Sequence, residues 1–182
     1  MVKKLLVLLA AFGFIGCATA QTRSAEIKAA DGTVVVVNVD PVTRKVTAVE
    51  SADAVMRGVD MVLGPAGMRG SEMSLRWHFA VFLRRDVQPQ RIVVEDVTAS
   101  PVRLLVDDVS PSLEGQVWAK SSRAVPLAGP LLADFNSGDF WGAIFKVSIT
   151  LPNDTVTHLY QYAAYGPNRR AEMLRTALEA NK

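Results

Sequence analysis

The sequence predicts an all-β protein whose core is an antiparallel β-sandwich. Two segments carry this prediction, 73–84 and 141–151, because apolar residues occupy every second position in both. Side chains alternate across a strand, so each segment would bury one face and leave a more polar face outside. The rest of the chain offers further short apolar runs separated by turn residues, a spacing typical of an all-β domain.

The first twenty residues predict export. Lys3 and Lys4 precede an uncharged apolar run, 5–16, which is too short to cross a bilayer as a helix and has the length of a secretory signal core. Cleavage after the small residues of Ala18-Thr19-Ala20 would leave one domain, 21–182. No later apolar run approaches membrane length, so we expect no transmembrane span in the mature chain.

Cys17 offers a second processing route. The tetrad Phe14-Ile15-Gly16-Cys17 resembles a bacterial lipobox, in which the cysteine is lipidated and becomes the first mature residue. Phe14 departs from that pattern, which usually has leucine at this position. Two outcomes stay open: a soluble periplasmic or secreted domain, or a lipoprotein anchored to the outer membrane through Cys17.

Composition limits the bonds that can stabilise the exported chain and the classes of partner that it can bind. Cys17 is the only cysteine, so no disulfide can form within the mature chain and packing must supply its stability. Loss of Lys3 and Lys4 with the signal reduces the 20 basic residues to 18, against 18 acidic residues. A chain of net charge near zero is poorly suited to neutralising phosphates, which argues against a nucleic-acid partner.

The first strands of the domain should form a small meander. Segments 25–30 and 33–39 flank the pair Asp31-Gly32, which tolerates the positive φ angles of a two-residue hairpin turn. A turn around Pro41 then leads into a third strand, 45–50.

A change of period after residue 50 predicts a short helical insertion. Val55, Val59, Val62 and Leu63 have the spacing of one helical face, and Ser51 is a candidate N-cap for a helix over 51–63. Segment 64–70 contains three glycines and a proline, so we expect a flexible loop there.

The remaining segments continue the β pattern. Further strand candidates are 91–97, 102–107, 114–120 and 155–165, and the connection 121–138 is rich in Pro, Gly and small residues. A closing helix over 168–180 would present Ala171, Leu174, Ala177 and Leu178 as a narrow apolar stripe. In outline this order resembles an immunoglobulin-like or fibronectin-type sandwich with Greek-key character. The resemblance is one of architecture only, since the Cys, Trp and Cys spacing of immunoglobulin domains is absent.

Residue patterns predict neither a catalytic site nor a metal or cofactor site. His78 and His158 lie far apart, without the spacing of a zinc motif. No Gly-x-Ser-x-Gly elbow occurs. In the pairs Glu95-Asp96 and Asp107-Asp108, neighbouring carboxylates would point to opposite faces of a strand and could not share a proton.

One outward sheet face is the strongest candidate for binding. Arg76, His78, Phe82 and Arg84 share it on segment 73–84, and Trp118 would also face outward if Val117 faces the core. A mixed aromatic and basic surface can stack a sugar or dock a protein. The alternative is that the C-terminal helix or the connection 121–138 simply covers this face.

The sequence therefore favours a non-enzymatic binding or assembly module of the bacterial cell envelope, with a protein or an envelope polymer as its partner. Binding would use the outward face or segment 64–70. The alternative is an envelope hydrolase whose site is assembled from dispersed residues. A deep pocket holding several titratable groups of shifted pKa would favour the hydrolase, whereas a shallow apolar patch would favour the binding module.

Overall fold

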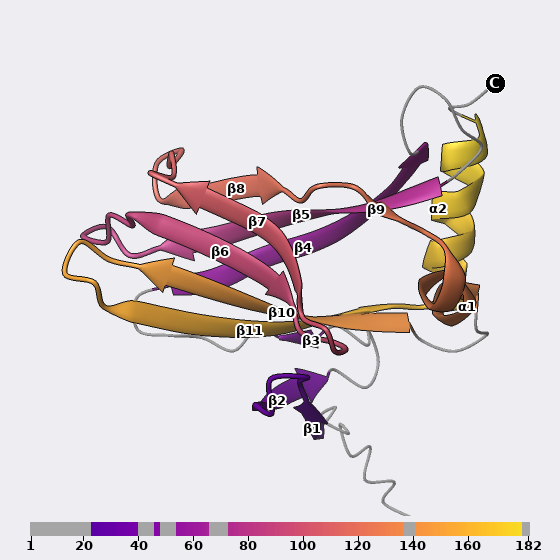
Figure 1. Cartoon of the computed structure of the whole chain (residues 1–182), viewed down its shortest axis with the longest axis horizontal. Helices are drawn as coiled ribbons and strands as arrows, with labels where there is room; N and C mark the ends of the chain where they lie inside the picture. The colour runs from indigo at the N-terminus through magenta and orange to yellow at the C-terminus, as the bar shows by residue number, and fades with distance from the viewer. Residues whose placement is uncertain (1–22, 40–45, 48–53, 66–72, 137–140, 180–182) are drawn as a thin grey trace, which may run out of the picture.

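The computed structural model of the chain describes residues 23–39, 46–47, 54–65, 73–136 and 141–179. Cys17 and the rest of the predicted export signal lie outside the described residues. Within the described ranges no helix has both the length and the apolar character needed to cross a membrane. The described part is mostly β structure, arranged in one small and two larger antiparallel sheets (Figure 1).

Two larger sheets form the body of the fold. One has the order β4-β5-β8, with the short β9 also paired to β5, and the other has the order β11-β10-β6-β7. Their strands are β4 (Ala54–Pro65), β5 (Met73–Leu83), β6 (Arg91–Asp96), β7 (Arg103–Val109), β8 (Val117–Ser121), β9 (Val125–Pro126), β10 (Trp141–Thr150) and β11 (Val156–Tyr165).

The core lies between β5 and β10. Both strands bury alternate residues, as their sequence patterns predicted. The rings of Trp77 and Phe79 meet Phe145 edge-on, with centroids 5.7 Å and 5.1 Å apart, and Trp77 stacks on Trp141 at 6.4 Å. Aromatic pairs in these geometries add attraction to the burial of their area, so this cluster joins the two sheets into a sandwich.

The small sheet is the predicted N-terminal meander. It consists of β1 (Arg23–Lys28), β2 (Val34–Val39) and β3 (Val46–Thr47) in that order, with Gly32 in the turn at a φ of 88°. The hairpin is confirmed, but its turn is not the predicted two-residue type. The Gly32 amide donates to the Ala29 carbonyl at 3.0 Å and the Ala29 amide donates to the Thr33 carbonyl at 2.8 Å, so the loop has three residues, and of the pair only Gly32 has a positive φ.

The meander docks on the outer face of β10 and β11. Ala29 packs with Val97 and Ile144, and Ile27 and Tyr160 lie against this second apolar cluster. Polar contacts surround it: the Tyr160 hydroxyl donates to Asp31 at 3.2 Å, and the Lys146 ammonium lies 3.5 Å from the same carboxylate.

The helix predicted over 51–63 is wrong, because β4 occupies Ala54–Pro65 and pairs with β5 along its length. The register shifts between Met56 and Gly58, and this bulge interrupts the two-residue repeat that would have marked a strand. Three of the four residues read as a helical face are valines, which favour strands. Of the loop expected at 64–70, Gly64 and Pro65 belong to β4, and residues 66–70 lie outside the described ranges.

The long connection contains structure that the sequence did not predict. After β9 it forms α1 (Gly129–Asn136), which buries Phe135 against Trp141 with ring centroids 5.8 Å apart. The predicted C-terminal helix is confirmed as α2 (Pro167–Glu179). Both helices lie at one end of the sandwich (Figure 1).

The predicted apolar stripe of α2 is only partly correct. Ala177 is buried, but Leu178 is 59% exposed, and Arg170 and Met173 occupy the buried face. Arg170 has partners on this buried face: its guanidinium donates to the carbonyl of Phe135, near the C-terminal end of α1, and lies over the Phe135 ring. A cation here satisfies a helix-end carbonyl and complements the negative end of the α1 dipole.

Candidate functional site

The outward face of β5 exists, but it is smaller than predicted. Arg76 and His78 are exposed and Phe82 is partly buried. Arg84 follows the end of β5 and is bound to Asp86, with Nε 2.6 Å from the carboxylate. His78 Nδ1 forms a hydrogen bond with the Ser121 hydroxyl at 2.7 Å. The structure therefore brings Arg76, His78 and Phe82 to one face.

Trp118 does not belong to that face, which corrects the prediction. It is fully buried and pairs with the buried Val81, while Val117 is partly exposed. A one-residue error in facing moves every side chain of a strand to the opposite face. The buried indole is tolerated because its Nε1 donates to the Asp108 carboxylate at 2.7 Å, which satisfies its only polar group.

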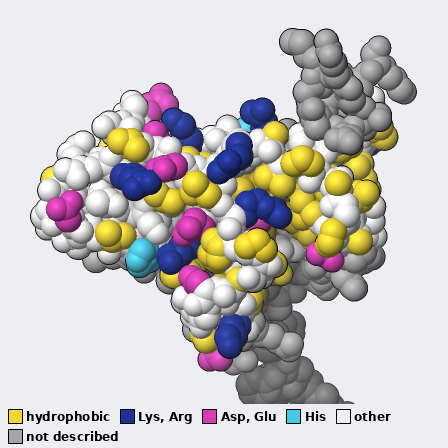
Figure 2. Space-filling view, viewed as in Figure 1, with side chains coloured by type: hydrophobic (Ala, Val, Ile, Leu, Met, Phe, Trp, Pro, Cys, Tyr) yellow, Lys and Arg dark blue, Asp and Glu magenta, His cyan; other side chains and the backbone are white. Residues whose placement is uncertain are grey.

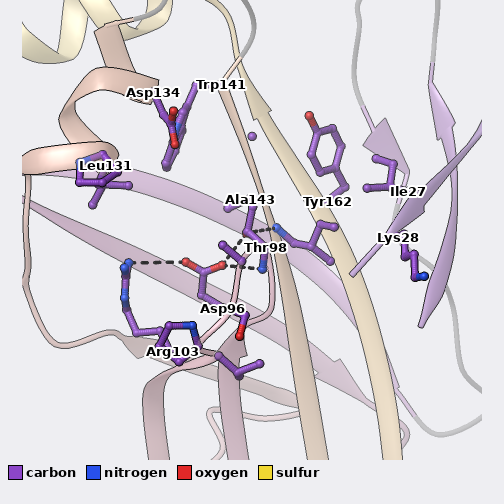
Figure 3. Close-up of a pocket in the computed structure, with 17 residues that line it drawn as sticks. Ile27, Lys28, Asp96, Thr98, Arg103, Leu131, Asp134, Trp141, Ala143 and Tyr162 are labelled. Carbon is purple, nitrogen blue, oxygen red and sulfur yellow. Dashed lines mark hydrogen bonds and ion pairs between the residues drawn. The ribbon is translucent and has the colours of Figure 1, made fainter. Parts of the chain in front are cut away.

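A cleft elsewhere is a better candidate site. It has a volume of about 720 Å³ and lies between β1, the turn that joins β6 to β7, α1 and the first residues of β10. Figure 3 shows Ile27, Lys28 and Tyr162 on one side, Leu131 and Asp134 of α1 on the other, and the Asp96–Arg103 pair at one end. None of these residues was among the sequence candidates.

The cleft exists because β6 leaves β10 early. Their last paired residues are Phe145 and Asp96, after which the Val97 amide still donates to the Ile144 carbonyl at 2.9 Å. The Val97 carbonyl instead accepts a hydrogen bond from Ala30 of the N-terminal meander, at 2.7 Å. Residues 141–143, which precede Ile144 in β10, have β11 on one side and the cleft on the other.

Thr98 closes the ladder at the point where β6 leaves. Its hydroxyl accepts the Ile144 amide at 2.9 Å and donates to the Asp96 carboxylate. Asp96 also accepts the Thr98 amide at 3.0 Å, and Arg103 lies 3.7 Å away on its other oxygen. This end of the cleft is thus held in place by side chains that bond to one another.

Tyr162 forms the opposite wall in an unusual contact with Gly142. Its ring lies where a Cβ at position 142 would be, so any larger residue there would overlap the phenol. Glycine inside a strand often marks such a close approach. Burial raises the pKa of Tyr162, so its phenol stays neutral and can donate a hydrogen bond at physiological pH.

The rim of the cleft is partly apolar. Val102 lines it and is 40% exposed, and Leu131 contributes from α1. Figure 2 shows hydrophobic side chains gathering toward the end of the sandwich that carries the helices, with charged side chains spread over the strands. Within the described ranges, no cluster of three or more His, Cys, Asp or Glu side chains is placed to hold a metal ion.

One signal in the sequence could have pointed to this site. Gly142 interrupts the apolar and polar alternation of a core strand, and an isolated glycine in a strand suggests a bulge or a close contact. The other walls come from segments distant in sequence.

The chain matches no protein-family model and is similar to no curated protein.

Proposed function

We propose that this chain is an exported, non-enzymatic binding or assembly module of the bacterial cell envelope, and that it holds its partner in the cleft at the start of β10. One observation carries the proposal: the cleft floor is the same strand whose inner face forms the aromatic core. A binding surface built on a packed strand is already organised before the partner arrives, which lowers the entropy cost of binding.

The polar groups of the cleft support binding more than catalysis. Asp96 accepts a hydrogen bond from Thr98 and pairs with Arg103. Tyr162 is neutral, because burial raises its pKa. A neutral phenol and an ion-paired carboxylate are suited to recognition through hydrogen bonds. A hydrolase would instead call for a free base or nucleophile with a pKa tuned toward neutrality.

We also infer that the sandwich is immunoglobulin-like. The chain places β4 and β5 in one sheet, β6 and β7 in the other, β8 in the first again, and β10 and β11 in the second. The return of β10 to the side of β6, across the strands between them, supports Greek-key character.

Export and anchoring rest on residues 1–20. If the lipobox is used, native material begins at a lipidated Cys17 and partitions with membranes, and Cys17→Ser makes it soluble. If cleavage follows Ala20, the same substitution leaves the mature product unchanged. Intact mass of the protein purified from its own envelope distinguishes the two, and an unprocessed Met1 in that material would contradict export.

Photocrosslinking tests the binding site itself. A benzophenone amino acid placed at Val102, on the cleft rim, should capture a protein or polymer in the native envelope. The matched control is Val109, which is also a valine, is 68% exposed and lies at the far end of β7. Adducts from position 102 alone support the proposal. Equal capture from both positions, no capture at 102, or hydrolysis of an envelope polymer by the purified protein would contradict it.

A further inference from the structure

On one side of the Gly142 backbone, no strand among the described residues pairs with it. In an antiparallel strand, alternate residues direct both their N–H and their C=O to the same neighbour. Ile144 directs both groups toward β6, since its carbonyl accepts from Val97 and its amide donates to Thr98. The two-residue repeat therefore aims the amide and carbonyl of Gly142 in the same direction, where β6 is no longer present.

The cleft follows this edge of β10. Its lining includes four consecutive residues, Trp141, Gly142, Ala143 and Ile144. Trp141 and Ala143 belong to the inner face of the sheet, whereas Gly142 and Ile144 belong to the outer face. A cavity over one face would touch alternate residues, so contact with all four means that it lies along the strand edge.

We propose that the cleft binds an extended peptide segment, which adds as a strand beside Trp141–Ile144 in the position that β6 vacates. This inference rests on the proposed binding function and names the class of partner. The peptide donates one backbone N–H to the Gly142 carbonyl and accepts one hydrogen bond from the Gly142 amide. Main-chain bonds of this kind hold a peptide in register, while pockets for alternate side chains select its sequence.

The walls define those side chains. A peptide residue directed to the inner side meets Leu131, Trp141 and Ala143, which favour an apolar side chain. Its neighbour, directed to the outer side, meets the neutral phenol of Tyr162. A phenol O–H donates a hydrogen bond, which favours a side chain with an acceptor oxygen. The preferred segment thus places an apolar residue next to a residue that accepts a hydrogen bond.

Backbone methylation of the partner tests this without altering the protein. Short random peptides displayed on phage are selected on the purified protein, and the best peptide is resynthesised with one N-methyl group at each position in turn. We expect one methyl, at the amide that faces Gly142, to weaken binding about tenfold, the loss of one hydrogen bond. Methylation of either neighbouring amide, which points away from β10, should change affinity less than about twofold.

Gly142→Pro and Gly142→Ala provide a matched pair in the protein. Both add a Cβ that displaces Tyr162, but only proline removes the amide. Gly142→Ala should therefore keep part of the peptide affinity, and Gly142→Pro should lose that part as well. Circular dichroism checks whether each variant is folded. If either variant is unfolded, the methylation series alone tests the proposal.

Several outcomes would overturn strand addition. They are a flat methylation profile, equal binding by the two glycine variants, failure to select any peptide, and pairing of two copies of this chain through β10 in place of peptide binding. If the Val102 crosslinker still captures a partner in those cases, binding in the cleft stands and only the peptide mode fails. If it captures nothing, the proposed function fails as well.

Discussion

The two halves of β10 differ in what flanks them. Residues 145–150 lie between β6 and β11, and their inner face carries the fully buried Phe145. Among the described strands, residues 141–143 pair with β11 alone, and they border the cleft. Ile144, between the two halves, still bonds to Val97 and Thr98 just after β6. One strand therefore supplies both the centre of the sandwich and the edge at which we place its function. The closed half stabilises the fold, and the open half is where we propose that a partner binds.

The N-terminal meander produces this difference. The Ala30 amide bonds to the Val97 carbonyl, the group that would otherwise accept the Ile144 amide, and the Thr98 hydroxyl accepts that amide instead. Among the meander side chains that the structure describes, those of residues 26–34, none belongs to the aromatic core cluster. Loss of its docking should therefore alter the cleft before it unfolds the sandwich.

The largest effect is expected in the closed half. Trp77→Ala and Phe145→Ala should each lower the free energy of unfolding by about 3–5 kcal/mol, because both rings are fully buried and leave cavities. Chemical denaturation measures the change, with the exposed Val109→Ala as a control expected within about 0.5 kcal/mol. A loss below about 1 kcal/mol at either aromatic position would show that the facing of β5 and β10 is misassigned.

Arg170 links the C-terminal helix to the wall of the cleft. Arg170→Met should cost about 1–3 kcal/mol, because it leaves the Phe135 carbonyl without its buried donor. Arg175→Met, on the exposed side of the same helix, is the control. We also expect faster amide exchange in α1, measured by mass spectrometry. Unchanged exchange in α1 would mean that Arg170 does not position this wall.

Gly142 tests the contact on the open half. Gly142→Ala should destabilise by about 1–3 kcal/mol, because its Cβ overlaps the Tyr162 ring. Adding Tyr162→Ala should recover most of that loss, and the double-mutant cycle measures the coupling between the two positions. Additive costs would contradict the close approach.

The smallest effect concerns the ion pair that helps to dock the meander. A hydrogen bond from the Thr33 amide, with further contributions from Tyr160 and Lys146, holds the pKa of Asp31 below its usual 3.8. Burial opposes the charge of Lys146, but Tyr160 and Asp31 outweigh it and raise the pKa of that amine. Asp31→Asn keeps the turn and removes the charge, so it should cost about 0.5–1 kcal/mol at neutral pH.

The pH dependence of that difference has a definite sign. Because the folded pKa of Asp31 is lowered, its contribution is present above pH 3.8 and is lost as the pH falls through the folded value. The stability gap between the native chain and Asp31→Asn should therefore close on acidification, as followed by denaturation at several pH values. If the difference in unfolding free energy persists at the lowest pH, the effect of Asp31→Asn comes from the turn and not from the ion pair.

The sequence predicted the parts of the fold that depend on local periodicity. Both core strands were correctly assigned because each predicted segment carries six alternating apolar positions. The hairpin was correctly assigned because Asp31-Gly32 marks a turn, although the turn has three residues and not two. β4 was misassigned as a helix because a bulge near Gly58 breaks its repeat. In the short β8, one wrong choice at Val117 inverted the face of Trp118.

The cleft could not be predicted in the same way. Its position depends on where β6 separates from β10. At that point Ala30 bonds to Val97 and Thr98 bonds to Ile144 of β10, and both contacts form only in the folded chain. Gly142 was visible as an irregularity, but its partner Tyr162 lies on another strand. Sequence patterns of one strand do not show which of its edges is left open.

Amide exchange along β10, followed residue by residue by NMR, tests the central claim most directly. The amides of Gly142 and Lys146 point in the same direction, but only Lys146 has β6 beside it. We predict that the Gly142 amide exchanges at nearly the rate of an unprotected amide, with Lys146 at least about a thousandfold slower. Equal protection of the two amides would show that the edge is already covered, and would contradict the assignment of an open strand position.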